Sequence, residues 1–361
     1  MKKVTLLILI AIIQLSFTAC NSDLTEELKG DLSKSTLVGE KDAFALVDGC
    51  YATFMMDGGY GFFTYKGYMR LFEAPTDGGL IKDSGIDKFK WGENIGLDLW
   101  ETAYTIVQRT NTAIQLIGDM EDGAFEDPTV KNRLIGEAKF LRAFAYSLLT
   151  SAFGDVPLIT STEPEALPAR TPLAEVVAQI MLDLTDAVSV LPETHPTEIG
   201  RATKGAANTL LAKMYMREAD WSKAKSAIDA VIGGPFDLYQ GPYRDLWLES
   251  SRKDNEFIFS IMSQGEDYSN GSSHHIKAFS PWGYDLGWSD FGVPKEIFYA
   301  MDANDARKDV IVNDLSGAYY GYVAAHGTAV AWLGYVILQK FSGNNRDVTA
   351  PNSAWGNYGS S

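Results

Sequence analysis

A tryptophan and an asparagine, Trp91 and Asn94, stand three residues apart in the string KWGENIG, just before an apolar repeat that begins near Leu97. A flat indole ring can stack on the C–H face of a neutral sugar, and an amide can hydrogen-bond to its hydroxyl rim. We therefore predict that Trp91 and Asn94 bind a saccharide as a pair. The alternative is structural, with Trp91 filling the gap between two helical hairpins.

Two further groups of aromatic residues lie in glycine-rich segments that lack a helical repeat. Trp282, Tyr284 and Trp288 form one group in SPWGYDLGWSDFG, and Tyr60, Tyr65 and Arg70 form the other. We predict that both contribute to ligand binding, with a satellite core as the alternative for the tryptophan-rich group. Aromatic residues on helical faces are instead expected in the core, and these are Trp100, Tyr104, Tyr146, Tyr215 and Trp221.

Residues for catalysis are not arranged in any of the common enzyme motifs. The chain contains no GxSxG elbow, P-loop, HExxH, CxxC or GxGxxG string. We therefore expect a protein that is not an enzyme. Carboxylate pairs are plentiful among 47 Asp and Glu residues, so a glycoside hydrolase stays open as an alternative.

Candidate metal ligands are also poorly spaced. The adjacent His274 and His275 point apart on any regular element and sit in a polar stretch, so we expect a solvated loop there. The acidic run from Asp302 to Asp309 lacks the glycine and terminal glutamate of an EF-hand loop. We expect this run to flank a helix carrying Arg307 and Lys308.

The elements that must position these residues are mainly helices. Apolar residues recur every three or four positions over 41–56, 97–117, 172–191 and 205–232, and Asn111 is the one polar interruption of the second stretch. The last stretch has the spacing of a tetratricopeptide repeat, a helical hairpin that buries its apolar faces by stacking on others. The fold class predicted is mostly α, with tetratricopeptide-like hairpins and an irregular second lobe. That lobe has few strands, with candidates at 256–262 and 335–341.

The string LIGEAKFLRAFAYSLLTSAFGDVPLIT, residues 134–160, combines a helix with its stop signal. Leucine and alanine recur on one face, which can accept a second helix closely. Gly154 and Pro157 then end the helix, because glycine releases the backbone and proline cannot continue it.

The amino terminus is typical of an exported lipoprotein. Lys2 and Lys3 precede an apolar run from Val4 to Ile13, which is too short to span a bilayer but suits a signal peptide. Cleavage before Cys20 would expose a thiol for lipidation, and several acyl chains give stable membrane anchoring. The alternative is ordinary secretion. The acidic stretch that follows Cys20 predicts a tether and display at the cell surface.

Composition excludes some partners. The net charge of −16 becomes −18 when Lys2 and Lys3 leave with the signal peptide, which argues against nucleic acid and polyanionic ligands. With Cys20 lipidated, Cys50 has no cysteine left to pair with, and its apolar neighbours predict a buried thiol.

The phrase EAKFLRAFAY followed by FGDVPLI resembles the SusD/RagB family of nutrient-binding outer-membrane lipoproteins. The resemblance implies a lid over a SusC-like TonB-dependent transporter, with neutral oligosaccharides as ligands and Trp91 and Asn94 as the glycan-binding pair. It also implies that a calcium ion can be bound, although no spacing here locates one and no other cofactor is expected. Family members usually continue into another helical segment, so this chain is expected to be a fragment or a truncated member.

The expected organisation is a signal peptide at 1–19, a lipidated tether at 20–40, a helical scaffold at 41–233 with a loop insertion at 58–96, a ligand-binding lobe at 234–341 and a disordered tail at 342–361. The predicted function is capture of oligosaccharides at the cell surface and their delivery to a transporter. A tetratricopeptide scaffold that binds only protein is the main alternative.

Overall fold

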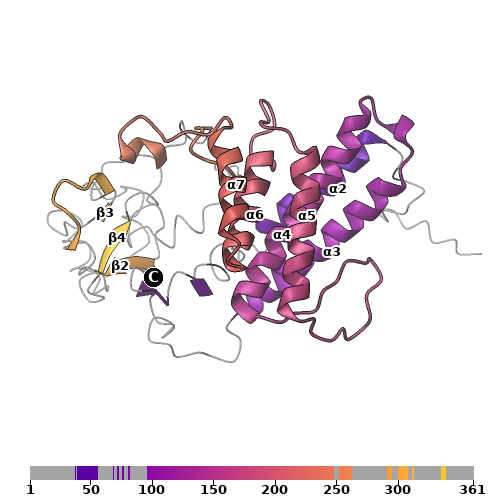
Figure 1. Ribbon diagram of the computed structural model, residues 1–361, viewed down its shortest axis with the longest axis horizontal. Coiled ribbons are helices and arrows are strands. Elements are labelled where there is room, and N and C mark those ends of the chain that lie inside the picture. The colour runs from indigo at the N-terminus through magenta and orange to yellow at the C-terminus, as the bar shows by residue number, and fades with distance from the viewer. Residues whose placement is uncertain are drawn as a thin grey trace, which may run out of the picture. The chain divides into compact units, whose positions relative to one another are not determined.

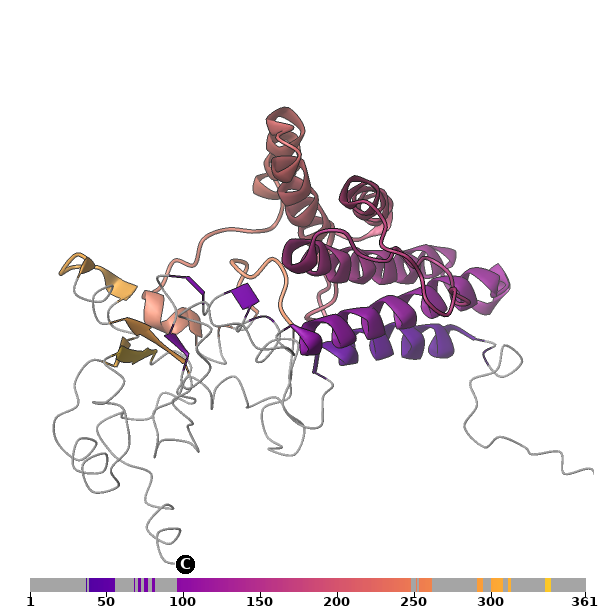
Figure 2. The ribbon, with the colours of Figure 1, turned by 90° about the horizontal axis from the view of Figure 1, so that it is seen from below.

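The computed structural model describes residues 37, 39–55, 68, 71–72, 75–76, 80–81, 96–247, 251, 253–261, 291–294, 300–307, 311–312 and 335–338. Six helices occur in this part of the chain: α2 (Glu40–Ala52), α3 (Leu97–Asp119), α4 (Pro128–Phe153), α5 (Leu173–Val190), α6 (Lys204–Arg217) and α7 (Trp221–Ile232). Each packs against the helix that follows it, and α2 also packs on α4 (Figures 1 and 2). The predicted mostly α fold class is therefore confirmed.

Side chains and turns set the helix boundaries, and α4 begins at Pro128, six residues before the predicted start. Asp127 caps α4 by accepting a hydrogen bond from the Thr129 N–H at 2.8 Å, and Thr203 caps α6 through the Ala206 N–H at 3.1 Å. At the far end of α4, Gly154 has a φ of 72°, a left-handed conformation that favours glycine. The stop predicted from Gly154 and Pro157 is therefore confirmed.

Helices α4 and α5 approach closely because α4 carries glycine at the contact. A Cβ atom added to Gly136 would lie only 2.4 Å from Cγ2 of Val190. The same helix buries Ala138, Ala143 and Ala145 in the core. Small residues at these positions are what allow a second helix to pack against this face of α4.

A polar network in the core explains residues that the apolar pattern left unexplained. Arg142 of α4 forms a two-pronged ion pair with Asp183 of α5, at 2.8 Å from Nε to Oδ2 and 2.7 Å from Nη2 to Oδ1. Its third nitrogen donates to Asn111 Oδ1 at 2.8 Å, which accounts for the polar interruption of α3. One arginine thus ties three helices together.

The residues after α4 are held down by the same region. Asn111 donates its amide to the carbonyl oxygens of Ile159 and Ser161, at 3.0 and 3.2 Å. The Tyr146 hydroxyl accepts from the Ile159 N–H at 2.6 Å and donates to the Ile159 carbonyl at 3.1 Å. The string at 134–160 is therefore one unit, in which helix residues satisfy the backbone groups of the turn that follows.

Short strands make up the sheet of the described residues: β1 (Leu80–Ile81), β2 (Phe291–Pro294), β3 (Ile311–Val312) and β4 (Tyr335–Leu338). They pair antiparallel in the order β1-β2-β4-β3, with Val293 opposite Val336 and Ile311 opposite Leu338. The strand predicted at 335–341 is confirmed for 335–338.

The strand predicted at 256–262 is wrong, since residues 256–261 form turns and bends. Side chains rather than backbone ladders hold this segment. The Phe259 ring packs on Phe140 and Phe144 of α4, with centroids 5.0 and 6.1 Å apart, and Glu256 accepts from the Tyr239 N–H. Apolar and aromatic residues favour a strand, but here they serve as anchors to a helix.

Burial of the remaining predicted core residues is mixed. Tyr146 and Cys50 are fully buried, and burial raises the pKa of the Cys50 thiol to about 12, so it stays protonated and unreactive. Trp221 is 63% exposed, so its predicted core position is wrong. It is the first residue of α7, next to the hairpin turn, where α6 is the main neighbour among the described helices and covers only one side.

The Arg142–Asp183 pair provides a direct stability test. Arg142→Met leaves a buried carboxylate without its main partner, so we expect a loss of roughly 3–5 kcal/mol in the free energy of unfolding. Urea denaturation followed by circular dichroism measures this loss.

The matched control is Lys139→Met, which breaks the Lys139–Asp186 ion pair between the same two helices. The side chains of that pair are 24% and 43% exposed. The control should cost about 0–1 kcal/mol. Equal losses would contradict the central role of Arg142.

Candidate functional site

The predicted ligand-binding residues all lie outside the described residues. These are Trp91, Asn94, Trp282, Tyr284, Trp288, Tyr60, Tyr65 and Arg70, and the same is true of the lipidation site Cys20 and the tail at 342–361. Their roles stay predictions. The described residues contain a second candidate, a pocket beside the connection between α5 and α6, which sequence reasoning missed.

One wall of this pocket is the α5–α6 loop, residues 191–203. The Lys204 N–H donates to the Pro192 carbonyl at 2.9 Å and so closes the loop at its base. Gly200 has a φ of 91°, which lets the backbone reverse immediately before Arg201. The loop is thus a compact closed unit rather than an extended linker.

Arg201 fixes this loop to the helices by three ion pairs. Its guanidinium lies 2.5 Å from Asp48 of α2, 3.0 Å from Glu137 of α4 and 2.7 Å from Glu198 of the loop itself. Arg133 of α4 adds a fourth contact, to Glu198 at 2.9 Å. Because these carboxylates come from two helices and the loop, the loop position is determined by charge pairing.

Glu137 is the buried centre of this cluster. Its Oε2 accepts hydrogen bonds from Arg201 and from the Tyr51 hydroxyl, both at 3.0 Å. Its Oε1 has no hydrogen bond among the described residues, and the Arg133 Nη1 lies 3.6 Å away. Burial raises the pKa of the Glu137 carboxyl, although the two arginines and His195 oppose this shift.

His195 completes the anchoring of the loop. Its Nε2 lies 2.9 Å from the Ala202 carbonyl oxygen, which can only accept, so Nε2 carries the proton. Its Nδ1 faces Arg133 at 3.4 Å and in the neutral ring acts as acceptor. The backbone N–H of Ala202 donates to the Tyr51 hydroxyl at 2.8 Å. Both polar groups of Ala202 are therefore satisfied by side chains that line the base of the loop.

The opposite wall is the turn at residues 253–260. The Phe257 N–H donates to the Asp254 carbonyl at 3.1 Å, and the Glu256 N–H donates to Asp254 Oδ1 at 2.9 Å. The Asn255 carbonyl accepts from the Asp237 N–H at 3.4 Å. Together with the packing of Phe259 on α4, these contacts hold the turn in place.

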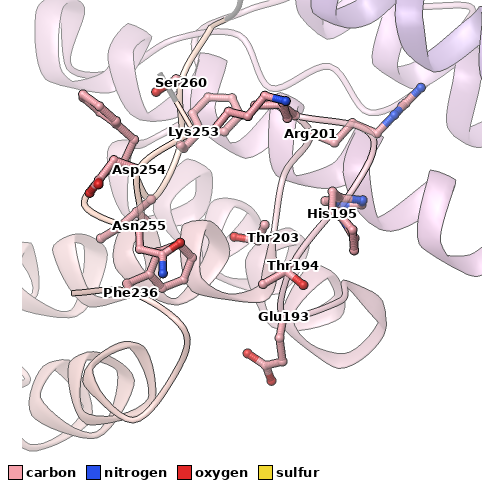
Figure 3. Close-up of a pocket in the computed structure, with 16 residues that line it drawn as sticks. Glu193, Thr194, His195, Arg201, Thr203, Phe236, Lys253, Asp254, Asn255 and Ser260 are labelled. Atoms are coloured by element: carbon pink, nitrogen blue, oxygen red, sulfur yellow. The ribbon is translucent and has the colours of Figure 1, made fainter. Parts of the chain in front are cut away.

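The pocket between the two walls has a volume of about 260 Å³ (Figure 3). Its polar side chains include Glu193, Thr194, Lys253, Asp254, Asn255 and Ser260. Its apolar side is formed by Ile199 and by the rings of Phe236 and Phe257. Phe236 sits directly on the backbone of α6, since a Cβ on Gly205 would lie 2.1 Å from a ring carbon.

No group of three histidine, cysteine or acidic side chains that could hold a metal ion occurs in the described part of the chain. Within the acidic run at 302–309, Asp305 pairs with Arg307, and Asp302 accepts from the Asn304 N–H at 2.8 Å. These carboxylates shape a turn. Among the described helices, none combines the length and hydrophobicity that a membrane span requires.

Helical hairpins stacked around buried ion pairs define a tetratricopeptide-like protein. A family model, SusD-like_3, described as starch-binding and associating with the outer membrane, matches residues 77–216, which include α3, α4 and α5. SusD-like protein P2 of Formosa agariphila is 29% identical over 349 residues, covering 89% of this chain and 66% of that protein. A SusD-like protein of Bacteroides ovatus is 25% identical over 243 residues, 62% of this chain and 44% of that protein. The chain is thus similar to SusD-like proteins both in this segment and over most of its length.

Solved structures share this fold. Surface glycan-binding protein A of Bacteroides thetaiotaomicron, in complex with laminarihexaose, superposes with a TM-score of 0.69 at 21% identity, over 86% of this chain and 73% of that one. A laminarin-binding SusD-like protein gives a TM-score of 0.66 at 23% identity, over 87% and 74%. The alignments with the curated relatives named above span two thirds of their length or less.

The pocket was missed because its two walls are distant in the sequence and neither carries a motif. The one signal was the string LPETHPTEIGRATK between two helical repeats, which has more charged and polar residues than a simple turn needs. Proline and glycine in it predict a loop. Nothing in it predicts that Arg201 pairs with a buried glutamate on α4, or that Glu198 pairs with Arg133 of the same helix.

Glu137 gives a prediction about pH. Because its pKa is raised in the folded protein, the folded state binds more protons than the unfolded state from the ordinary value of 4.5 up to the raised value. Its contribution to the free energy of unfolding is therefore fully present below 4.5 and declines as the pH rises through that window. Glu137→Gln removes this dependence while keeping an acceptor for Tyr51.

The measurement is urea unfolding of the native protein and of Glu137→Gln at several pH values. We expect the difference, native minus variant, to fall as the pH rises. The pKa of Glu198 is lowered by Arg133 and Arg201 against the effect of burial, so its contribution to the free energy of unfolding increases with pH. Because both proteins contain Glu198, this contribution cancels in the difference. A difference that stays flat or increases with pH would show that burial does not dominate at Glu137.

Proposed function

We propose that this protein is a surface lipoprotein of the outer membrane that captures neutral oligosaccharides and delivers them to a SusC-like TonB-dependent transporter. The observation that carries the proposal is similarity to SusD-like proteins, in the match at 77–216 and in the shared fold. One structural neighbour is in complex with laminarihexaose, and another is named as laminarin-binding. Both of these ligands are neutral glucans. The chain's negative charge also favours uncharged ligands over polyanions.

The proposed ligand site consists of aromatic residues in irregular segments, first Trp91 with Asn94, then the group of Trp282, Tyr284 and Trp288. Each stacked ring adds roughly 0.5–1.5 kcal/mol beyond burial, and association must first offset several kcal/mol of lost motion. A few rings therefore give weak binding, roughly micromolar to millimolar. Weak binding suits a receptor that must release its ligand to a transporter. The protein acts without catalysis in this proposal.

Tryptophan substitutions test the ligand site. We expect Trp91→Ala to weaken binding of a neutral oligosaccharide such as laminarihexaose, or of another member of a neutral glycan panel, by about tenfold. Isothermal titration calorimetry on the purified chain measures this change. Trp221→Ala is the matched control, because Trp221 is an exposed tryptophan on a helix outside the proposed site. Binding unchanged in both Trp91→Ala and Trp288→Ala would refute the site, and a chain that binds no member of the panel would refute the function.

Lipid anchoring is tested at Cys20. We expect Cys20→Ala to abolish incorporation of labelled palmitate and to release the protein from the membrane fraction, because the acyl chains supply the anchor. Cys50→Ala is the control, since this buried cysteine cannot be reached by an acyltransferase. Continued labelling of the Cys20→Ala protein would rule out the proposed anchor.

A further inference from the structure

We propose that the pocket between the α5–α6 loop and the turn at 253–260 binds one neutral sugar ring, either a monosaccharide or the terminal residue of an oligosaccharide. This inference goes beyond the proposed function, because the pocket is built from residues other than the aromatic groups assigned above. It rests on four features of the pocket: free polar groups, an apolar ring, charge balance and fixed walls.

Several polar side chains line the pocket without a protein partner. Among the described residues, no hydrogen bond or ion pair occupies the Thr194 hydroxyl, the Ser260 hydroxyl, the Asn255 amide or the Lys253 ammonium. These groups include both donors and acceptors, in contrast to Thr203, whose hydroxyl is used to cap α6. A ligand that carries many hydroxyl groups can satisfy such a mixture, because each hydroxyl both donates and accepts.

An aromatic side chain lies beside these groups. Phe236 lines the pocket next to Asn255, and the hydrogen bond between Asp237 and the Asn255 carbonyl links their two segments (Figure 3). The close contact with Gly205 fixes the ring against α6. A ring next to an amide is the combination that a sugar needs, with C–H groups against the ring and hydroxyls on the amide.

The charges around the pocket largely cancel. Two positive residues, Arg201 and Lys253, and two negative residues, Glu193 and Asp254, line the pocket. Arg201, together with Arg133, faces Asp48, Glu137 and Glu198, and Lys204 pairs with Glu193 at 2.9 Å. That leaves Lys253 and Asp254, which are adjacent in the chain and opposite in sign. An anion would meet the carboxylate of Asp254, and a cation would meet Lys253 and Arg201. The geometry therefore favours an uncharged ligand.

The volume and rigidity of the pocket further limit the size of ligand that it can bind. Pockets for drug-sized molecules measure roughly 300–1,000 Å³, so a volume of about 260 Å³ fits a smaller ligand such as a single sugar ring. One wall is held by the Arg201 ion pairs and the other by Phe259 packed on α4. Because both walls are formed without ligand, binding costs little further ordering of the protein.

The experiment is a ligand-observed saturation-transfer NMR titration of the full chain with glucose, galactose and mannose, then with laminarihexaose and with glucuronate. We expect at least one neutral monosaccharide to bind weakly. The double variant Thr194→Val/Asn255→Ala should weaken that binding about fivefold or more, because two neutral hydrogen bonds are lost. Both side chains are exposed at the pocket rim, so the variant keeps the fold. Phe236→Ala should weaken it as well, with thermal unfolding recorded to separate lost binding from lost packing.

Asn304→Ala, an exposed asparagine outside the pocket, is the control and should bind as the native protein does. In the Trp91→Ala background, which lacks the main ring of the proposed oligosaccharide site, adding Thr194→Val/Asn255→Ala should remove the remaining monosaccharide signal and so assign that signal to this pocket. A stronger effect of laminarihexaose than of monosaccharides in the Trp91→Ala protein would identify the ligand as a chain terminus. The inference is overturned if no neutral monosaccharide binds, if the double variant binds like the native protein, or if glucuronate binds more tightly than glucose. A chain that binds a neutral monosaccharide but no oligosaccharide of the neutral glycan panel would overturn the proposed function alone.

Discussion

The ion pair between Arg142 and Asp183 is the interaction on which the helical scaffold depends. Both side chains are almost fully buried, and a buried charge is tolerated only when its partners are close and well aligned. The arginine meets this requirement by adding Asn111 of α3 as a third partner. Asn111 in turn binds the backbone that follows α4. The register of three helices and the path of the next loop are thus set by one set of hydrogen bonds.

The Arg201 cluster uses the same principle closer to the surface. Here Arg201 lies in a loop, and its carboxylate partners come from α2, from α4 and from the loop itself, with Glu137 fully buried beneath it. The cluster positions a loop instead of joining helices, and that loop forms a wall of the pocket. Phe44 packs against two guanidiniums of this cluster, those of Arg133 and Arg201, each 5.2 Å from the ring centroid.

Much of the helical scaffold could be predicted from the sequence, because apolar periodicity and stop signals act locally. The helix predicted at 97–117 corresponds to α3 (Leu97–Asp119), and the hairpin predicted at 205–232 corresponds to α6 and α7. Asn111 was recognised as an interruption, but not its partner Arg142, which lies 31 residues away and meets it only through helix packing. The predictions of a buried Trp221 and of a strand at 256–262 were wrong for a related reason. Residue type favours burial in the first case and a strand in the second, but the neighbouring elements decide the outcome. The predicted aromatic site lies outside the described residues, so the sequence argument for it stands on residue chemistry and family resemblance.

The central claim is that a rigid helical scaffold holds irregular segments that bind saccharide. Hydrogen exchange of the full chain, followed by mass spectrometry with and without a bound neutral oligosaccharide, tests it most directly. The account predicts slower exchange in peptides that contain Trp91 and residues 282–288, with no change in α4 and α5. Protection confined to the helices, with none in the aromatic segments, would contradict it.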